Sequence, residues 1–382
     1  MIPAITCPLE KCAGRVLRQA ITADRPLPPF NRSMMDGYAL RAADIGAVDT
    51  FTVTAQVHAG TAAQTIGAQI GNCAEIMTGA VVPSDADCVV PYEVTATSAD
   101  GRIRLLQPSE HRAGDCIHYL GSDHAAGSVL LPANVRLGSR EIAIAATCGH
   151  AELRVTQMPA ISIVSTGDEL VDVAATPAAH QIRRSNDLSI QTALTNAQLH
   201  AKARIHLPDD AALSQQRLAQ LIQTNTFLII SGGISMGKKD YIPATLDALG
   251  LLNHFHGVQQ KPGKPFGFWS NVHCAVFTLP GNPLSALTAL HHYVIPAIQT
   301  AMGAPAAKII HSVQLAAPAK ARDDMTIFLP IQRIEGNQVR PHPAQNSGDQ
   351  ASILATDGYI ELPPTPQKIY PAGSQFDLHP WL

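Results

Sequence analysis

The spacing of apolar residues changes several times along the chain. Near the N-terminus, apolar side chains recur at helical spacing, which predicts a first helix that ends at the prolines after residue 25. The apolar positions of this predicted helix are Leu9, Cys12, Ala13, Val16, Leu17 and Ala20. Between residues 51 and 107 the apolar runs are short and are separated by turn residues, which indicates a small, mostly β domain. An alanine-rich stretch over 137–146 returns to helical spacing, and we expect it to pack back against the first helix. The β domain would then be an insertion into an outer helical unit.

The second half of the chain alternates short apolar runs with helix-like stretches. The predicted strands are 161–165, 227–231 and 275–279, and the predicted helices are 188–199 and 284–298. Alternating β and α elements with apolar strands favour a parallel sheet that helices cover on both faces. After about residue 305, β-like runs return and predict a small C-terminal β domain. These runs are 309–315, 326–333 and 359–362.

Composition narrows the class of protein. Of the 382 residues, 46% are hydrophobic and only 15% are charged, whereas a disordered chain has high charge and low hydrophobicity. The 27 basic and 30 acidic residues leave a net charge of -3, which argues against a protein that binds nucleic acid through its phosphates. The seven cysteines form no C-x-x-C pair, and we find neither a signal peptide nor an apolar run long enough to span a membrane. We therefore expect a cytoplasmic protein with reduced thiols.

Three predicted strands lead directly into polar, glycine-rich loops. These loops are 166–169, 232–237 and 280–283. In an open parallel sheet, ligands bind in the crevice at the carboxyl ends of the strands, where all three loops would lie. Glycines let backbone N–H groups approach an anion closely, and the helix that follows adds a positive dipole end. The loops together predict a phosphate or oxyanion pocket with acids nearby for a divalent cation. Any one of them taken alone could equally be a tight turn or a helix cap.

Two further segments carry candidate chemistry. Residues 232–239 approach the pattern of a P-loop, but Lys239 stands where that loop needs Ser or Thr for magnesium, so we reject this interpretation. Asp240 beside it could hold a cation or cap a helix. Lys261 and Lys264 flank a Pro-Gly turn, and two such cations suit a pyrophosphate or an oxyanion. Two solvated surface lysines would show the same pattern.

The remaining motifs are weak by themselves. The 16 histidines include the adjacent His291 and His292, and H-E-x-x-H does not occur. G-x-S-x-G occurs once, at 233–237, within the glycine-rich loop already assigned to an anion pocket. We expect neither metal–histidine chemistry nor a catalytic triad. The stretches 32–39 and 75–87 are rich in turn residues, so their composition alone indicates turns.

Taken together, these segments resemble the molybdopterin molybdenumtransferase family, which includes the bacterial MoeA proteins and the E domain of gephyrin. The matching stretches follow the family's order and cover essentially the whole chain, fading after about residue 306. They are 33–39, 76–80 with Pro83 and Asp87, 121–123, 165–170, Ser185 with Asn186, 231–237 with Asp240, 261–265 and 279–283. No single motif is decisive, but their shared order is highly specific.

The resemblance implies a multidomain fold of α/β plus β class. An outer linking unit would cover 1–24 and 130–157, and an inserted β domain would cover 25–129. The central α/β domain, 158–305, would bind molybdopterin with a parallel or mixed sheet and helices on both faces. The segment 306–382 would form a barrel-like β domain. Members of the family are homodimers, and their active site lies where the central domain meets N-terminal segments of the partner chain.

The resemblance also implies a reaction. Adenylylated molybdopterin and molybdate would give the molybdenum cofactor and AMP, with Mg²⁺ assisting cleavage of the pyrophosphate link. This chemistry needs cations, hydroxyls and backbone N–H groups around oxyanions, because its catalysis is mostly positioning and charge stabilisation. The finished cofactor would pass to a molybdoenzyme or its chaperone.

Roles for individual residues follow from the same resemblance. Glu169 and Asp240 would hold magnesium, and Asp36 with Thr78 would complete the pocket across the dimer interface. The predicted catalytic residues are Glu169, Asp240, Asp36, Thr78, Lys261 and Lys264. The predicted substrate-binding residues are Asp123, Ser185, Asn186, Ser231, Gly232, Gly233, Ser235, Gly237, Pro280, Gly281, Asn282 and Pro283.

Two positions depart from the family's pattern. Met34 stands where a smaller residue is usual, and Arg184 replaces the commoner acidic residue before Ser185. Arg184 could tune oxyanion affinity, or it could mark a paralogue with a shifted substrate.

Two alternative functions stay open. One is a related enzyme that adenylylates molybdopterin or acts on other nucleotides, which usually lacks the Asp36 and Thr78 motifs. The other is a carrier that holds molybdopterin or finished cofactor without inserting molybdenum.

Overall fold

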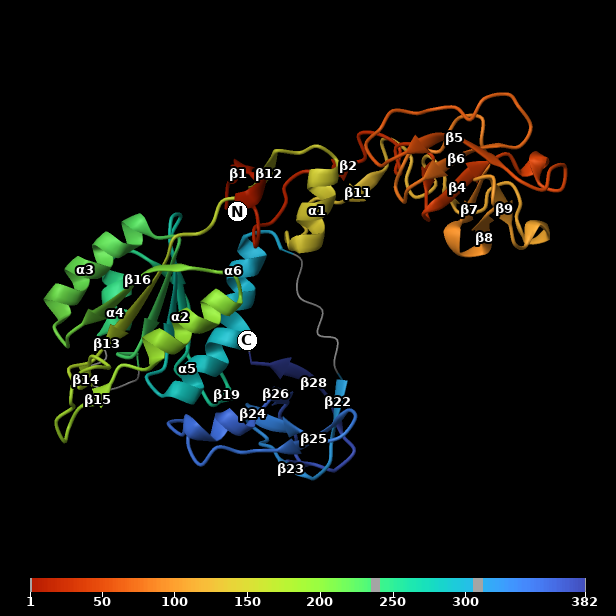
Figure 1. Ribbon diagram of the computed structural model, residues 1–382. Coiled ribbons are helices and arrows are strands. Elements are labelled where there is room, and N and C mark those ends of the chain that lie inside the picture. The colour runs from red at the N-terminus through yellow and green to blue at the C-terminus, as the bar shows by residue number, and fades with distance from the viewer. Residues whose placement is uncertain (1, 235–240, 305–311, 382) are drawn as a thin grey trace. The chain divides into compact units, whose positions relative to one another are not determined.

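The computed structural model describes residues 2–234, 241–304 and 312–381, which divide into two compact units (Figure 1). The larger unit consists of Met1–Arg18, Asn134–Gly138 and Leu153–Leu382, and the smaller unit consists of Gln19–Ala133 and Ser139–Glu152. The smaller unit is therefore an insertion into the larger one. Within the described ranges, no helix has both the length and the apolar character needed to cross a membrane.

The smaller unit is mostly β, as its short apolar runs predict. Its main sheet has the strand order β5-β6-β4-β7, in which β4 is antiparallel to both neighbours and β5 is parallel to β6. Both faces of this sheet are buried, because Leu40 and Val90 pack on one side while Ala39 and Val89 pack on the other. The strands of this unit are β2 (Ile21–Thr22), β3 (Arg32–Ser33), β4 (Gly37–Leu40), β5 (Thr52–Val57), β6 (Asn72–Ile76), β7 (Cys88–Pro91), β8 (Thr95–Thr97), β9 (Ile103–Leu105), β10 (Ile117–His118) and β11 (Val129–Leu131). Its helix α1 (Ser139–Thr147) confirms the alanine-rich prediction.

The predicted N-terminal helix is wrong. The segment forms strand β1 (Ala4–Pro8), which pairs with β12 (Glu152–Thr156), and then a single 3₁₀ turn, η1 (Leu9–Lys11). Gly14 has a φ of +78°, a left-handed conformation that ends any right-handed helix. The apolar residues at helical spacing lie instead beside segments that are distant in the sequence. The Leu17 N–H, for example, donates to the carbonyl oxygen of Val135 at 2.9 Å. There is accordingly no first helix against which α1 could pack.

A mixed six-stranded sheet forms the central α/β domain. Its order is β16-β13-β17-β21-β20-β18; the first four strands are parallel, and β20 and β18 are antiparallel to their neighbours. The strands are β13 (Ile161–Thr166), β16 (Ala201–Leu207), β17 (Phe227–Ser231), β18 (Leu252–His256), β20 (Gly267–Ser270) and β21 (Ala275–Leu279). The three predicted strands are confirmed, and they lie next to one another within the sheet.

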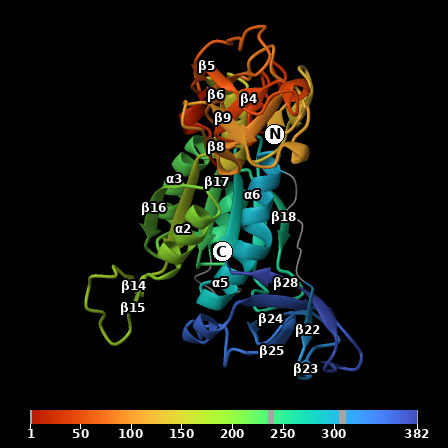
Figure 2. The ribbon, with the colours of Figure 1, turned by 45° about the vertical axis from the view of Figure 1, so that its right-hand side comes forward.

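Helices cover both faces of this sheet (Figure 2). They are α2 (Asn186–Asn196), α3 (Ala211–Thr224), α4 (Ile242–Ala248), α5 (Pro283–Ala289) and α6 (Ile295–Ala301). Leu194 of α2 and Ile298 of α6 share one core with Ile163, whereas Leu218 of α3 and Leu246 of α4 share the opposite core. A π-helical turn, η5 (Leu290–Val294), joins α5 to α6 inside the stretch predicted as one helix.

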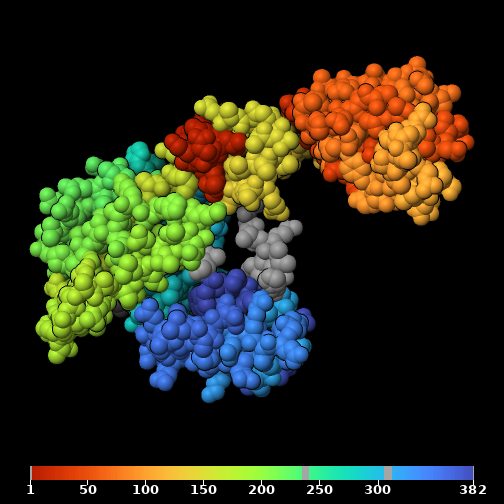
Figure 3. Space-filling model, viewed as in Figure 1, coloured from red at the N-terminus to blue at the C-terminus, as the bar shows by residue number. Residues whose placement is uncertain are grey.

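The C-terminal segment forms a closed β-barrel, as expected. Strands β24, β25, β22, β28 and β26 follow one another, and β26 pairs back with β24. The barrel packs against the central domain (Figure 3), and β19, which carries Lys261, pairs in parallel with β24. Further short pairs are β14 with β15 beside the central sheet and β23 with β27 in the barrel segment. The bounds are β14 (Leu170–Val171), β15 (Ile182–Arg183), β19 (Gln260–Lys261), β22 (Ser312–Leu315), β23 (Ala319–Lys320), β24 (Thr326–Arg333), β25 (Gln338–Pro341), β26 (Gly358–Leu362), β27 (Ile369–Tyr370) and β28 (Gln375–Pro380).

Candidate functional site

A cavity of about 640 Å³ opens at the carboxyl ends of β13, β17 and β21, and we call it the sheet-edge cavity. The loops that follow the three strands meet there, as parallel topology requires. The predicted residues that line it are Glu169, Ser185, Asn186, Ser231, Gly232, Gly233, Pro280, Gly281, Asn282 and Pro283. The structure thus brings together most of the predicted substrate-binding residues of the larger unit.

Two glycines form a close contact between the ends of β13 and β17. Gly232 and Gly233 have φ values of +96° and +65°. A Cβ atom on Gly232 would lie 2.8 Å from the carbonyl oxygen of Thr166, and one on Gly233 would lie 2.8 Å from the Thr166 Oγ1. Only glycine fits here without displacing the strand end beside it.

Asn186, the first residue of α2, bonds to the end of β17 and to the loop after β21. Its Nδ2 donates to the Ser231 Oγ at 3.0 Å and to the Gly281 carbonyl oxygen at 2.8 Å. The preceding residue, Ser185, makes no side-chain capping bond to this helix. The N-terminus of α2 therefore faces the cavity with its positive dipole end, which favours an anion.

Buried polar atoms at this cavity lack partners. Among the described residues, the Ser165 Oγ, the Thr166 Oγ1 and the Arg184 Nε are buried without any hydrogen bond. All three residues line the sheet-edge cavity. A buried polar group without a partner costs free energy, so such groups are expected to bond to a ligand or to water when the site is filled.

The rim of the cavity carries both signs of charge. The Glu169 carboxylate occupies the space that a side chain on Gly167 would need, and Asp209 also lines the cavity. Arg184 forms an ion pair with Asp172, with 3.2 Å between its Nη2 and the Oδ2, so part of its positive charge is compensated within the β14–β15 segment. A bond from the Ala174 N–H and then the Arg184 pair lower the pKa of Asp172.

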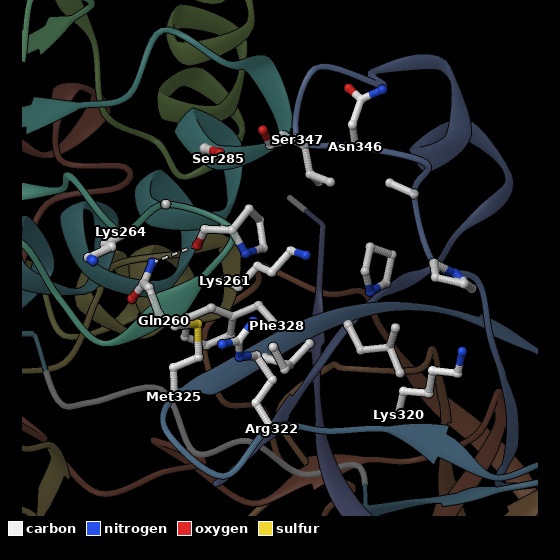
Figure 4. A pocket seen from close by; sticks show the side chains of 18 of the residues that line it. Gln260, Lys261, Lys264, Ser285, Lys320, Arg322, Met325, Phe328, Asn346 and Ser347 are labelled. Atoms are coloured by element: carbon white, nitrogen blue, oxygen red, sulfur yellow. Dashed lines mark hydrogen bonds between the residues drawn. The ribbon is translucent and has the colours of Figure 1, made fainter. Parts of the chain in front are cut away.

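A second, larger cavity of about 1070 Å³ lies between the 261–265 loop and the barrel, and we call it the interdomain cavity. Figure 4 shows Lys261 and Lys264 from that loop and Lys320 and Arg322 from the barrel segment. Its described lining contains these four cations and no carboxylate. Just outside the cavity, Asp324 pairs with Arg322, the Oδ1 lying 2.7 Å from the Nε. A dianionic oxyanion would suit this lining.

The two cavities adjoin each other. Pro265, Pro280 and Asn282 line both of them. The Asn282 Nδ2 donates to the Ser347 Oγ at 2.7 Å, which fixes the barrel loop at this junction. The two predicted lysines lie in the interdomain cavity rather than in the sheet-edge cavity.

Three predicted residues lie in the smaller unit. The Asp36 carboxylate accepts hydrogen bonds from the Thr78 N–H at 2.6 Å and from the Thr78 Oγ1 at 2.7 Å. These two bonds, the backbone bond first, lower the pKa of Asp36. The Asp123 Oδ1 lies 2.8 Å from the His118 Nε2, and Arg32 contacts the other nitrogen of that ring at 3.1 Å. The bond to His118 is the largest cause that lowers the pKa of Asp123.

Three predicted residues, Ser235, Gly237 and Asp240, lie outside the described residues. Of the predicted magnesium pair, only Glu169 can therefore be placed. Sequence reasoning missed Asp209, which follows the unpredicted strand β16 and supplies a second carboxylate to the same cavity. Carboxylate oxygens are the ligands that a hard cation such as Mg²⁺ prefers.

Two protein families match the chain. The family described as the MoeA N-terminal region, domain I and II, matches residues 2–149. The family described as a probable molybdopterin binding domain matches residues 162–300. The second match contains all of the central sheet except Ile161, together with the loops that follow β13, β17 and β21.

Individual relatives match over most of their length. The molybdopterin molybdenumtransferase of Synechocystis is 36% identical, over 98% of this chain and 95% of the relative. That of Haemophilus influenzae is 30% identical, over 77% of this chain and 72% of the relative. The solved structure of a molybdopterin biosynthesis MoeA protein from Pyrococcus horikoshii superposes with a TM-score of 0.77 at 26% identity, covering 100% of this chain and 95% of that one.

Proposed function

Because the chain belongs to the molybdopterin molybdenumtransferase family, we propose that it transfers molybdenum from molybdate to adenylylated molybdopterin, forming the molybdenum cofactor and releasing AMP. The observation that supports this most is the pair of adjoining cavities. One presents unpartnered hydroxyls and a helix N-terminus, and the other presents four cations.

The two cavities suit different parts of the substrates. The sheet-edge cavity suits the pterin and its phosphates, because the N-terminus of α2 faces it and the Ser165 and Thr166 hydroxyls lack other partners. The interdomain cavity suits molybdate, a dianion that the ammonium groups of Lys261 and Lys264 would hold. Asn282 lines both cavities and would contact the substrates where they meet.

Magnesium is the cation that we propose for this reaction. Glu169 and Asp209 supply carboxylates at the sheet-edge cavity, and Asp240, outside the described residues, stays a predicted third ligand. When bound, the ion would offset negative charge on the pyrophosphate link. The chain's own contribution is to hold the phosphates beside these carboxylates and to orient them with Asn186 and Ser185.

The active form that we propose is a cytoplasmic homodimer that passes its product to a molybdoenzyme or its chaperone. The resemblance of the 33–39 and 76–80 motifs to the family supports a role for Asp36 and Thr78 at the partner's site. The hydrogen bonds within this pair keep the Asp36 carboxylate ionised, so it is ready to contact a cation or a polar substrate group.

The test is AMP release. Purified protein with adenylylated molybdopterin and Mg²⁺ should release AMP only when molybdate is added. Lys261→Gln should slow release by about 100-fold, because one preorganised charge at an oxyanion is lost. Lys11→Gln, at an exposed lysine remote in sequence from either cavity, is the matched control and should keep full activity. Tight pterin binding without AMP release would instead favour a carrier.

A further inference from the structure

A cluster of potential metal ligands lies where the central domain meets the barrel, away from the residues assigned above. His292 comes from the π-helical turn η5, Glu361 from β26 and His379 from β28. One nitrogen from each imidazole and one carboxylate oxygen all lie within 4.8 Å of one another. The His292 Nε2 is 3.9 Å from the Glu361 Oε2, and the two imidazole ring centroids are 5.1 Å apart.

The donor set is the one that zinc uses with an open coordination position. Two imidazole nitrogens and one carboxylate oxygen bind Zn²⁺ in tetrahedral sites whose fourth ligand is water. Bonds of about 2.1 Å at tetrahedral angles place neighbouring donors about 3.4 Å apart. The 3.9 Å between His292 and Glu361 is therefore within a small side-chain adjustment of that geometry.

An aromatic residue supports both rings. Tyr359 is only 1% exposed, and its hydroxyl lies 3.3 Å from the His292 Nδ1, the ring nitrogen that faces away from Glu361. The same Tyr359 ring stacks on His379 with an interplanar angle of 9° and centroids 5.0 Å apart. Histidine ligands commonly donate their second ring N–H to an oxygen acceptor, which fixes the ring orientation and the tautomer, and the Tyr359 hydroxyl is placed to be that acceptor for His292.

The backbone at His292 is itself unusual. The π-helical turn interrupts what would otherwise be one long helix from α5 to α6. Single π turns are rare inside α-helices and are frequent at functional sites. In this turn the His292 ring packs on Phe328 of the barrel strand β24, with ring centroids 4.6 Å apart.

We propose that His292, His379 and Glu361 form a Zn²⁺ site that ties the barrel to the central domain. Phe328, which packs on His292, also lines the interdomain cavity (Figure 4). A bound ion would therefore hold one wall of that cavity in place. No short sequence motif indicates the site, because its ligands come from three separate elements. If the site binds Zn²⁺, the sequence-based expectation of no metal–histidine chemistry is wrong.

The test is metal binding by the full-length protein. Protein stripped with a chelator and titrated calorimetrically with Zn²⁺ should show one site per chain, and Co²⁺ should give the visible absorption of a tetrahedral centre. His379→Gln and Glu361→Gln should each weaken Zn²⁺ binding by more than about 100-fold. That loss exceeds the one typical when a residue that only supports a metal ligand is changed. His273→Gln, at an exposed histidine, is the control and should leave Zn²⁺ affinity unchanged.

A second readout separates ligation from folding. Zn²⁺ should raise the melting temperature of the wild-type chain and of His273→Gln but not that of His379→Gln, each compared with the same variant without metal. Tyr359→Phe, at a positioning residue, should weaken binding by about 10-fold to 100-fold. The proposal is wrong if the wild type binds no Zn²⁺ at micromolar concentration, or if the ligand variants bind it as the wild type does. Either result would identify the cluster as aromatic packing only.

Discussion

At the scale of single residues, Asp36 shows how an exposed carboxylate can be held in its charged form. It accepts two hydrogen bonds from one residue, Thr78. Both bonds favour the ionised form and lower the pKa, and the backbone N–H has the larger effect. Because the folded-state pKa lies below the unfolded one, this contribution to stability is present above the ordinary Asp pKa and is lost as pH falls through the folded pKa.

The two bonds can be separated by Thr78→Val, which removes the hydroxyl and keeps the N–H. We expect the titration midpoint of Asp36 to rise in this variant but to stay below that of an ordinary aspartate, since the larger of the two causes remains. Carboxyl-carbon NMR, assigned by comparison with Asp36→Asn, measures the midpoint. An unchanged midpoint in Thr78→Val would show that the hydroxyl bond does not form in solution.

At the scale of elements, the sheet-edge cavity depends on how closely two strand ends approach each other. Gly233→Ala should destabilise the fold, because a Cβ atom would meet the Thr166 Oγ1 at 2.8 Å and the Ile242 Cγ1 at 3.0 Å. The positive φ alone costs about 1 kcal/mol for a non-glycine residue. Gly250→Ala is the matched control, because Gly250 has a φ of +78° and open space around it.

Urea unfolding of the two variants isolates the cost of the close approach. Gly250→Ala should lose only the backbone contribution to the free energy of unfolding, whereas Gly233→Ala should lose clearly more. It should also bind adenylylated molybdopterin more weakly, since Thr166 would be displaced in the cavity. Equal losses of stability in the two variants would contradict the packing described at β13 and β17.

Elements buried on both sides could be predicted from the sequence, and half-exposed ones could not. Strands β17 and β21 coincide with the predicted bounds, because an interior parallel strand is apolar on both faces. The edge strand β16 alternates between half-buried and exposed residues and was missed. The N-terminal helix was predicted wrongly because apolar residues such as Val16 and Leu17 are buried by long-range pairing, which local spacing cannot reveal.

At the site, features that follow from the topology of the sheet could be predicted, whereas those that depend on long-range pairing could not. The loops after β13, β17 and β21 could be placed together from topology alone, since parallel strands end at one edge. Nothing in the local sequence indicates that Lys261 would join a barrel strand through β19. The lysines consequently belong to a neighbouring cavity, and Asp209 was missed with the strand that precedes it.

At the scale of the whole molecule, the proposed site needs residues from both compact units. Asp36 belongs to the smaller unit and Lys261 to the larger one. In the proposed homodimer these residues would serve one site from two different chains. Mixed dimers of Asp36→Asn and Lys261→Gln chains would then contain one intact site each.

Each variant alone should release AMP slowly, whereas the two co-expressed with different tags should regain molybdate-dependent AMP release. The expected recovery is about a quarter of the wild-type rate, because half of the dimers are mixed and half of their sites are intact. Tag-based purification of the mixed dimer measures its share of the population. Mixed dimers without activity would indicate that each site is built within a single chain.

The interleaved course of the chain also sets the order in which the protein can fold during synthesis. The whole of the smaller unit lies within residues 19–152, so all of its segments are available once that stretch has emerged from the ribosome. Strand β1, by contrast, must wait for β12, and the Ile2 N–H must wait for the carbonyl oxygen of Ala301, 3.5 Å away in the finished fold. Strand β1 is thus translated before the smaller unit but can pair only after that unit has been made.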